Sequence, residues 1–143
     1  MKKGFTVIEL LVVVAIIAIL ASIVIISIDA YRTRSSNTSI QAILGQIRSE
    51  SVLYQQTNGS FDGLCTATGE YRIVEQRSEA CFQAGLNLGD SACRCDAEPN
   101  TWVIAVPLRN SDLGAAWCVD SENFGGGIDA TRFNAIGGGV LCQ

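Results

Sequence analysis

The apolar run near the N-terminus constrains this chain more than any other feature. Every residue from Leu10 to Ala21 is apolar, and the apolar character continues with two serine interruptions to Ile28. As an α-helix rising about 1.5 Å per residue, the stretch from Phe5 to Ile28 is roughly 36 Å long. The hydrocarbon core of a bilayer is about 30 Å thick. The run therefore predicts a single transmembrane helix.

A cleaved secretory signal peptide is the alternative interpretation of this N-terminus. Lys2 and Lys3 would supply its charged start, but the apolar region of a signal peptide spans about 7 to 15 residues and ends in an A-x-A-like cleavage site. The run here is longer, and Ala15, Ala18 and Ala21 are spaced by three. The pattern favours a helix that is retained in the membrane.

The cysteines indicate the compartment of the rest of the chain. They all follow the apolar run, at Cys65, Cys81, Cys93, Cys95, Cys118 and Cys142. This density is typical of small domains in an oxidising exterior, where disulfides substitute for a large core. We therefore expect the C-terminal part outside the membrane and the N-terminus in the cytoplasm. The pairing stays open, except that Cys93 and Cys95 are too close to pair comfortably with each other.

Composition excludes several classes of function. The 10 basic and 14 acidic side chains give a formal charge of -4, which argues against binding nucleic acid by phosphate neutralisation. The chain has no histidine, so a Ser-His or Cys-His catalytic pair and a His-ligated zinc are excluded. The cysteines also lack the C-x-x-C spacing of a zinc cluster. We expect a protein that is not an enzyme.

Oxygen ligands near the C-terminus give a weak indication of calcium. Four of them surround a Gly-rich stretch, at Asp120, Glu122, Asn123 and Asp129. The D-x-D-x-D-G spacing of a calcium loop is absent. We therefore favour a solvated acidic loop and expect neither a metal nor another cofactor.

One carboxylate, Glu9, interrupts the apolar segment. An ionised acid near the bilayer centre costs about 2.5 to 3.5 kcal/mol, and less near the interface. Glu9 is therefore a candidate functional residue with a partner elsewhere. The alternative is that it lies at the level of the lipid headgroups.

The residues from Lys2 to Leu11 read KKGFTVIELL. This stretch resembles the class III leader of type IV pilins and type II secretion pseudopilins. The resemblance implies that a membrane-embedded prepilin peptidase cuts between Gly4 and Phe5, and that Phe5 becomes the N-methylated N-terminus. The amino group freed on Phe5 is then a cation that Glu9 of a neighbouring copy neutralises in a low-dielectric filament core.

The resemblance also implies a structural function. A family member is stored in the bacterial inner membrane as a single-pass protein with its C-terminal domain outside. An assembly platform driven by an ATPase extracts it, and it packs with copies of itself into an extracellular or periplasmic filament. We favour a type IV pilus subunit. The alternatives are a pseudopilin of a type II secretion system and, from a different class, a membrane-tethered extracytoplasmic binding domain.

The helix is predicted to continue beyond the membrane. Residues 29–39 contain neither Gly nor Pro, and an apolar helical stripe follows at Ile40, Ile43, Leu44 and Ile47. Asn58-Gly59 supplies a stop signal. The second half of the helix is therefore amphipathic, and its stripe is expected to pack on this chain's own outer domain.

The outer domain is predicted to hold a small antiparallel sheet. Residues 102–108 have the pattern of a strand, a turn follows at 110–114, and residues 116–119 form the second strand of a hairpin. A last short strand is expected at 140–142. The aromatic residues are expected in the core rather than as exposed contacts, at Tyr71, Trp102, Trp117 and Phe124.

The region between the long helix and the hairpin is ambiguous. Residues 71–74 have a brief strand-like pattern, and residues 78–86 a helical one. The predicted fold class is α+β and pilin-like, with a long N-terminal helix packed on a small antiparallel β-sheet with disulfides. Its predicted parts are a cleaved leader, a transmembrane or filament-core helix, the amphipathic continuation and a cysteine-rich globular domain, at residues 1–4, 5–28, 29–56 and 57–143.

Overall fold

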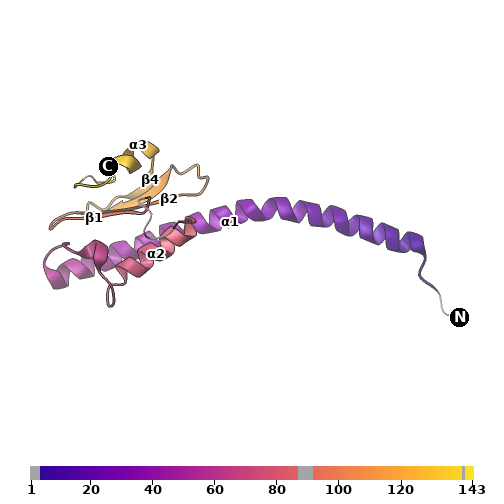
Figure 1. Cartoon of the computed structure of the whole chain (residues 1–143), viewed down its shortest axis with the longest axis horizontal. Coiled ribbons are helices and arrows are strands. Elements are labelled where there is room, and N and C mark those ends of the chain that lie inside the picture. The colour runs from indigo at the N-terminus through magenta and orange to yellow at the C-terminus, as the bar shows by residue number, and fades with distance from the viewer. Residues whose placement is uncertain (1–3, 87–91, 140) are drawn as a thin grey trace. The chain divides into compact units, whose positions relative to one another are not determined.

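The computed structural model describes residues 4–86, 92–139 and 141–143, with the side chains of 24–27 excepted (Figure 1). The chain divides into two compact units, Met1–Thr33 and Arg34–Gln143. The helix α1 runs through the boundary between them. In chain order the elements are α1 (Val7–Asn58), the 3-10 helix η1 (Leu64–Thr66), α2 (Ile73–Gln83), β1 (Arg94–Ala97), β2 (Trp102–Pro107), β3 (Ala116–Asp120), β4 (Gly125–Ile128) and α3 (Ala130–Ala135).

The first unit is the apolar part of α1. Among the described residues, α1 is the one helix long and apolar enough to cross a membrane, with a mean hydropathy of 3.3 in its apolar window. No part of that window is buried within the chain. Leu11, for example, is 65% exposed and Ile17 is 59% exposed. Such a surface needs an apolar environment from outside the chain, either lipid or other subunits. The predicted apolar helix is confirmed.

The second unit begins with the amphipathic part of α1. Ile40, Leu44 and Ile47 recur on one helix face and are fully buried in the core of this unit. The helix ends at Asn58, where Gly59 takes φ +77° and donates its backbone N–H to the carbonyl of Gln55. A left-handed glycine after the last helical residue is a common helix terminator. The predicted continuation and its stop signal are both confirmed.

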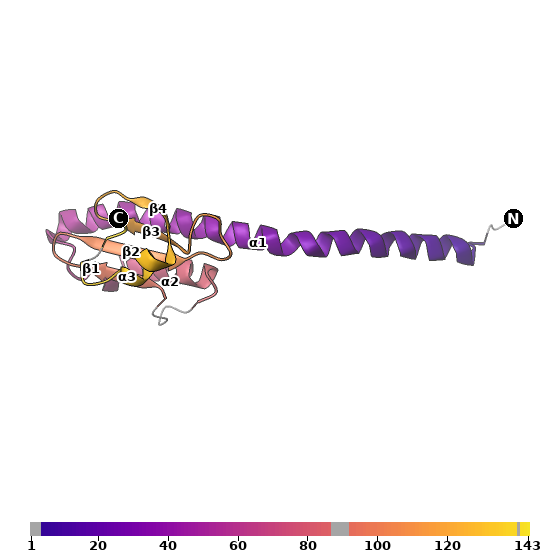
Figure 2. The ribbon, with the colours of Figure 1, turned by 90° about the horizontal axis from the view of Figure 1, so that it is seen from above.

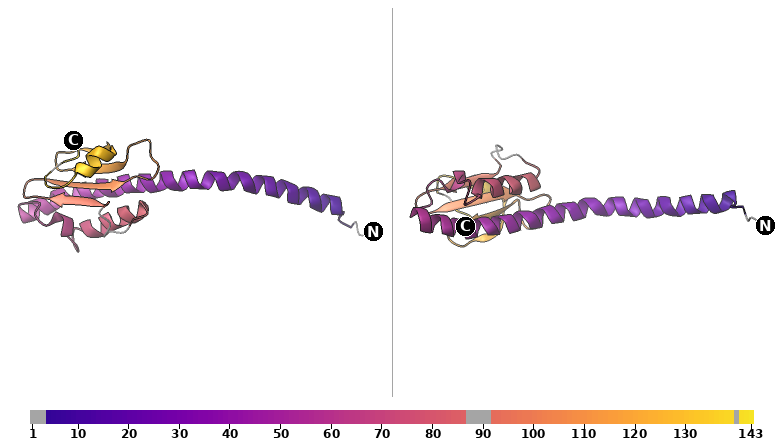
Figure 3. Two further views of the ribbon diagram at one scale, coloured as in Figure 1. Left: turned by 45° about the horizontal axis from the view of Figure 1, so that its top comes forward. Right: turned by 90° about the horizontal axis from the view of Figure 1, so that it is seen from below.

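The sheet is an antiparallel meander in the order β1-β2-β3-β4. The predicted hairpin is confirmed, because β2 pairs with β3 in a register that places Ile104 opposite Val119. The strand β2 is buried on both faces. Ile104 joins a core cluster with α1 and α2, and Val103 joins a second cluster near α3 and the C-terminal segment. Figure 1 shows the sheet between α1 and α2 on one side and α3 on the other, and Figures 2 and 3 show the same elements from other sides.

The ambiguous segment is helical, and one predicted strand is wrong. Ile73 and Val74, which have a strand-like pattern, begin α2, and Ile73 is a fully buried residue of the helix face that meets the core. Leu141 and Cys142, expected in a last strand, form no ladder. The N–H of Cys142 instead donates to the Asp120 carboxylate at 3.0 Å. Val140 of the same prediction lies outside the described residues.

The Gly-rich stretch expected to be a loop forms the strand β4. It pairs with β3 from Val119↔Gly125 to Ala116↔Ile128. A Cβ atom at Gly127 would collide with the backbone carbonyl of Leu113, so the β2–β3 loop can approach β4 only because this residue is glycine. Glycine has low β propensity, which is why the strand pattern is invisible in the sequence.

The six cysteines form three disulfides, Cys65–Cys95, Cys81–Cys93 and Cys118–Cys142. Cys93 and Cys95 therefore bond to different partners. The first two bridges join the β1 region to η1 and α2, and the third ties the C-terminal segment to β3. The aromatic residues expected in the core pack there, with Trp102 buried and Tyr71, Trp117 and Phe124 half-buried against the clusters.

A buried amide joins α1 to the segment after β2. Asn37 Nδ2 donates to the carbonyl of Arg109 at 2.8 Å, and Asn37 Oδ1 accepts from the N–H of Arg109 at 2.9 Å. Asn37→Leu leaves the N–H and the carbonyl of Arg109 without these hydrogen-bond partners. We therefore expect a loss of about 2 kcal/mol in the free energy of unfolding. Urea unfolding of the detergent-solubilised chain measures this loss. The control Thr38→Val, at an exposed neighbour, is expected to stay within about 0.5 kcal/mol. Equal stability of Asn37→Leu and wild type would contradict the prediction.

Candidate functional site

The start of α1 brings Thr6 and Glu9 together. Glu9 Oε2 accepts hydrogen bonds from the backbone N–H of Thr6 at 2.9 Å and from the Thr6 hydroxyl at 2.7 Å. In return, the N–H of Glu9 donates to Thr6 Oγ1 at 3.3 Å. This reciprocal arrangement is a capping box, in which the N-cap residue and the third helical residue satisfy each other's N–H groups. The carboxylate is thus held at the first turn of the helix.

The residues of the predicted cleavage site precede the helix. Gly4 and Phe5 are exposed, and Phe5 is 73% exposed. A Cβ atom placed on Gly4 would meet nothing within 4 Å. The described residues therefore leave the Gly4–Phe5 bond uncovered and accessible to a protease.

Thr6 is the residue of this site that our sequence analysis missed. The T-x-x-E spacing from Thr6 to Glu9 is the sequence signature of a capping box before an apolar run. The capping box also explains how an isolated chain tolerates Glu9 in an apolar segment. Its two hydrogen bonds to the carboxylate partly replace the water that this group loses. Both of these bonds go to Oε2, so a donor from another chain can still bind Oε1.

The calcium candidates have other roles in the structure. Asp120 is buried and its carboxylate accepts three backbone N–H groups, from Glu122, Phe124 and Cys142, at 3.0, 3.1 and 3.0 Å. Asp129 caps α3 by accepting from the N–H of Arg132 at 2.8 Å. The side chains of Glu122 and Asn123 are exposed. Within the described ranges, no group of three or more His, Cys, Asp or Glu side chains is placed to hold a metal ion.

Comparison with known proteins identifies the class of this chain. Residues 1–25 match the family model of the prokaryotic N-terminal methylation motif. The chain is 46% identical over 107 residues to the type IV wide pilus major component PilA4 of Thermus thermophilus, covering 73% of this chain and 82% of that protein. No solved structure matches the chain significantly.

These features define a subunit of the prepilin type, with a methylation motif, an apolar N-terminal helix and a disulfide-bonded α+β domain. The chain belongs to the type IV pilin family. Proteins of this family are structural subunits and not enzymes.

Proposed function

We propose that this protein is the major subunit of a type IV pilus. Prepilin peptidase removes residues 1–4 and methylates the new N-terminus at Phe5. The methylation motif at residues 1–25 and the relative's description as a major pilus component support this assignment. The uncovered backbone at Gly4 supports the cut, because a glycine lets the protease approach closely.

Before assembly, the processed protein resides in the inner membrane with α1 across the bilayer and the disulfide-bonded domain outside. The exposed apolar surface of α1 supports this state, since it needs lipid around it before assembly. A platform driven by an ATPase then extracts the subunit. In the filament, α1 helices of other copies replace the lipid. This exposed apolar helix is the observation that carries the proposal.

Glu9 directs the docking of each incoming copy. Cleavage leaves a positively charged amine on Phe5, and the Glu9 carboxylate of a neighbouring copy neutralises it in the apolar filament core. The capping box supports this function, because Thr6 holds the carboxylate near the helix start while leaving Oε1 available. The same bonds make the carboxylate tolerable in lipid until a partner arrives.

The direct test is the presence of the protein in filaments sheared from cells that contain the assembly machinery. We expect filaments seen by electron microscopy to consist mainly of this chain, and to disappear when prepilin peptidase is deleted. Short periplasmic fibres formed only with a secretion system would indicate a pseudopilin instead. A protein that stays in the membrane of cells that pilate normally would indicate a tethered binding domain.

We expect Glu9→Gln to reduce the sheared filament fraction at least about tenfold, since removing one partner of a buried ion pair costs about 3 to 5 kcal/mol. Glutamine is also a capping-box residue, so the helix start is retained while the charge is lost. Immunoblots of the sheared and membrane fractions measure the ratio. The control Asp29→Asn removes an exposed charge outside the capping box and should stay within about twofold of wild type. Wild-type filament levels with Glu9→Gln would contradict the role of the charge.

A further inference from the structure

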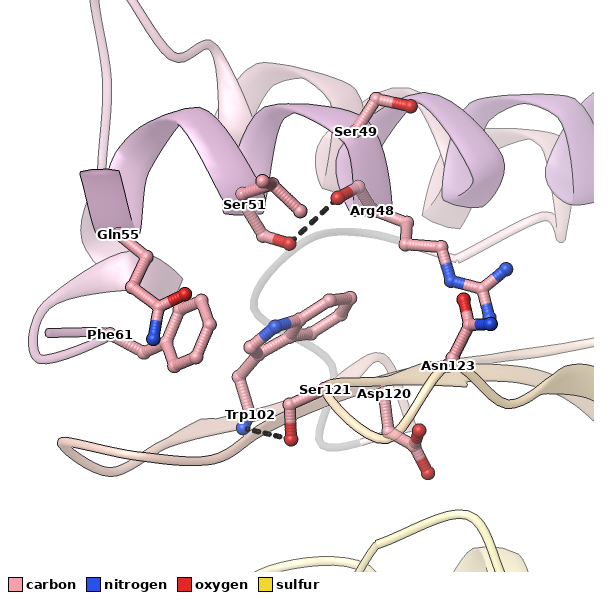
Figure 4. Close-up of a pocket in the computed structure, with 10 residues that line it drawn as sticks. Arg48, Ser49, Ser51, Gln55, Phe61, Trp102, Asp120, Ser121 and Asn123 are labelled. Atoms are coloured by element: carbon pink, nitrogen blue, oxygen red, sulfur yellow. Dashed lines mark hydrogen bonds between the residues drawn. The ribbon is translucent and has the colours of Figure 1, made fainter. Parts of the chain in front are cut away.

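A cavity of about 260 Å³ lies between α1 and one end of the sheet, entirely within the second unit (Figure 4). Its apolar wall consists of Val52, Phe61 and Trp102, and the two rings of Phe61 and Trp102 meet edge to face at 6.3 Å. Arg48 lines the same cavity from α1. An apolar hollow with one arginine is typical of a recognition pocket, because the wall gives contact area and the cation gives orientation.

The Arg48 guanidinium lacks partners for two of its donors. Nε and Nη2 are buried and make no hydrogen bond to any described residue. These two nitrogens carry the parallel N–H groups on one side of the guanidinium, which is the geometry that binds both oxygens of a carboxylate. Gly125 lies beside the group, since a Cβ atom there would be 3.5 Å from Arg48 Nη1, which is an ordinary van der Waals contact. Figure 4 shows the guanidinium directed toward Asn123, an exposed residue that lines the same cavity.

The one acid among the residues that line the cavity already has hydrogen-bond partners. Asp120 lines the cavity, but its carboxylate accepts the three backbone N–H groups described above. Figure 4 shows this carboxylate pointing away from Arg48. No carboxylate of the described residues bonds these two nitrogens, so an acid from another chain would be a favourable counter-ion for the half-buried guanidinium.

The chain itself carries a matching group on the β2–β3 loop. Asp112 is exposed, and its neighbour Leu113 is 53% exposed. The two side chains are consecutive in the sequence and place an exposed acid next to an exposed large apolar group on one loop. The loop is held in place, because the N–H of Leu113 donates to Ser111 Oγ at 3.0 Å and its carbonyl packs on Gly127.

We propose that the Arg48 cavity of one copy binds Asp112 of the next copy, with Leu113 against the apolar wall. The two sites lie at opposite ends of the hairpin, since Val103↔Asp120 is at the cavity end and Pro107↔Ala116 at the loop end. A contact between two different patches passes from copy to copy and builds either a ring or an open row of subunits, and a filament requires the open row. This contact rests on the proposed filament function and adds a specific link between outer domains.

Zero-length cross-linking of R48K filaments tests the contact. The lysines of the chain are Lys2 and Lys3, which leave with the leader, so R48K gives the processed protein a unique lysine. A carbodiimide activates a carboxylate as its O-acylisourea. The lysine Nζ then displaces the urea and forms an amide, with net loss of one water from the pair. We expect a covalent dimer and higher multimers, with the peptide around residue 48 joined to the peptide containing Asp112.

Matched variants decide whether the link is specific. R48K/D112N should lose the cross-link, and R72K, which places the lysine at an exposed arginine, should not link to Asp112. A cross-link from residue 48 to a different acid, or none in intact filaments, would overturn the contact. Absence of wild-type filaments would contradict the proposed pilus function instead, so the two failures are distinguishable.

A charge-exchange experiment tests the same contact if R48K filaments are scarce. D112R changes an exposed loop residue outside the core, and we expect at least a roughly tenfold loss of sheared filaments. R48E/D112R restores the opposite charges and should recover assembly. The control E70R, at another exposed acid, should assemble as wild type. Normal assembly of D112R would overturn the proposal.

Discussion

Asp120→Ala is expected to lower the free energy of unfolding by about 4 kcal/mol, because hydrogen bonds to a charged acceptor contribute about 1.5 to 3 kcal/mol each. Asp120 is 1% exposed, and its carboxylate accepts backbone N–H groups from Glu122, Phe124 and Cys142. Removing it leaves these donors without an acceptor and frees the C-terminal segment from β3, apart from the disulfide. Urea unfolding of the solubilised chain, followed by tryptophan fluorescence, measures the change.

Two further variants separate the hydrogen bonds from general effects of charge. Asp120→Asn keeps one acceptor oxygen but turns an N–H₂ group toward backbone donors, so its loss should be about half as large. Glu122→Ala removes an exposed acid from the same turn and should change stability by less than about 0.5 kcal/mol. Equal effects of Asp120→Ala and Glu122→Ala would show that the backbone contacts do not carry the stability.

Gly4→Val is expected to abolish filament formation. A β-branched residue at the cleavage site keeps the protease away from the backbone, so the leader stays on and Phe5 never acquires a free amino group. The folded chain tolerates the change, because a Cβ atom at Gly4 meets nothing within 4 Å. The expected result is a full-length protein in the membrane fraction with an intact Met1 and with normal disulfides.

The matched control is Gly45→Ala, another glycine with open space around its Cβ position. It lies within α1, where alanine favours the helix, and its leader should be removed as in wild type. Efficient processing of Gly4→Val would contradict the requirement for glycine at the cut. Loss of processing in both variants would point to a general defect in membrane insertion.

The long helix and the central hairpin were predictable because each has a periodic pattern of apolar residues in the sequence. The stripe from Ile40 to Ile47 and the strand at 102–108 each repeat an apolar pattern over several residues, and both are buried as expected. The strand β4 was not predictable, since Gly125–Gly127 has no side-chain pattern and is selected by the close approach of the β2–β3 loop. The start of α2 was ambiguous because a window as short as 71–74 does not distinguish a helix from a strand.

The Glu9 site and the Arg48 cavity also differ in how far the sequence reveals them. Glu9 stands out as a lone acid in an apolar run, and its partner Thr6 could have been found from the T-x-x-E spacing. Arg48 carries no such signal, because in the sequence it is one arginine among the polar residues of an amphipathic helix. Its significance depends on tertiary structure, which places it beside Trp102 while Asp120 is engaged elsewhere.

The measurement that tests the central claim most directly is intact mass with N-terminal sequencing of the protein from membranes and sheared filaments, with and without reduction. We predict a chain that begins at N-methylated Phe5, and a gain of six hydrogens on reduction for the three disulfides. An intact Met1 in cells with active prepilin peptidase would contradict the account and leave a membrane-tethered domain.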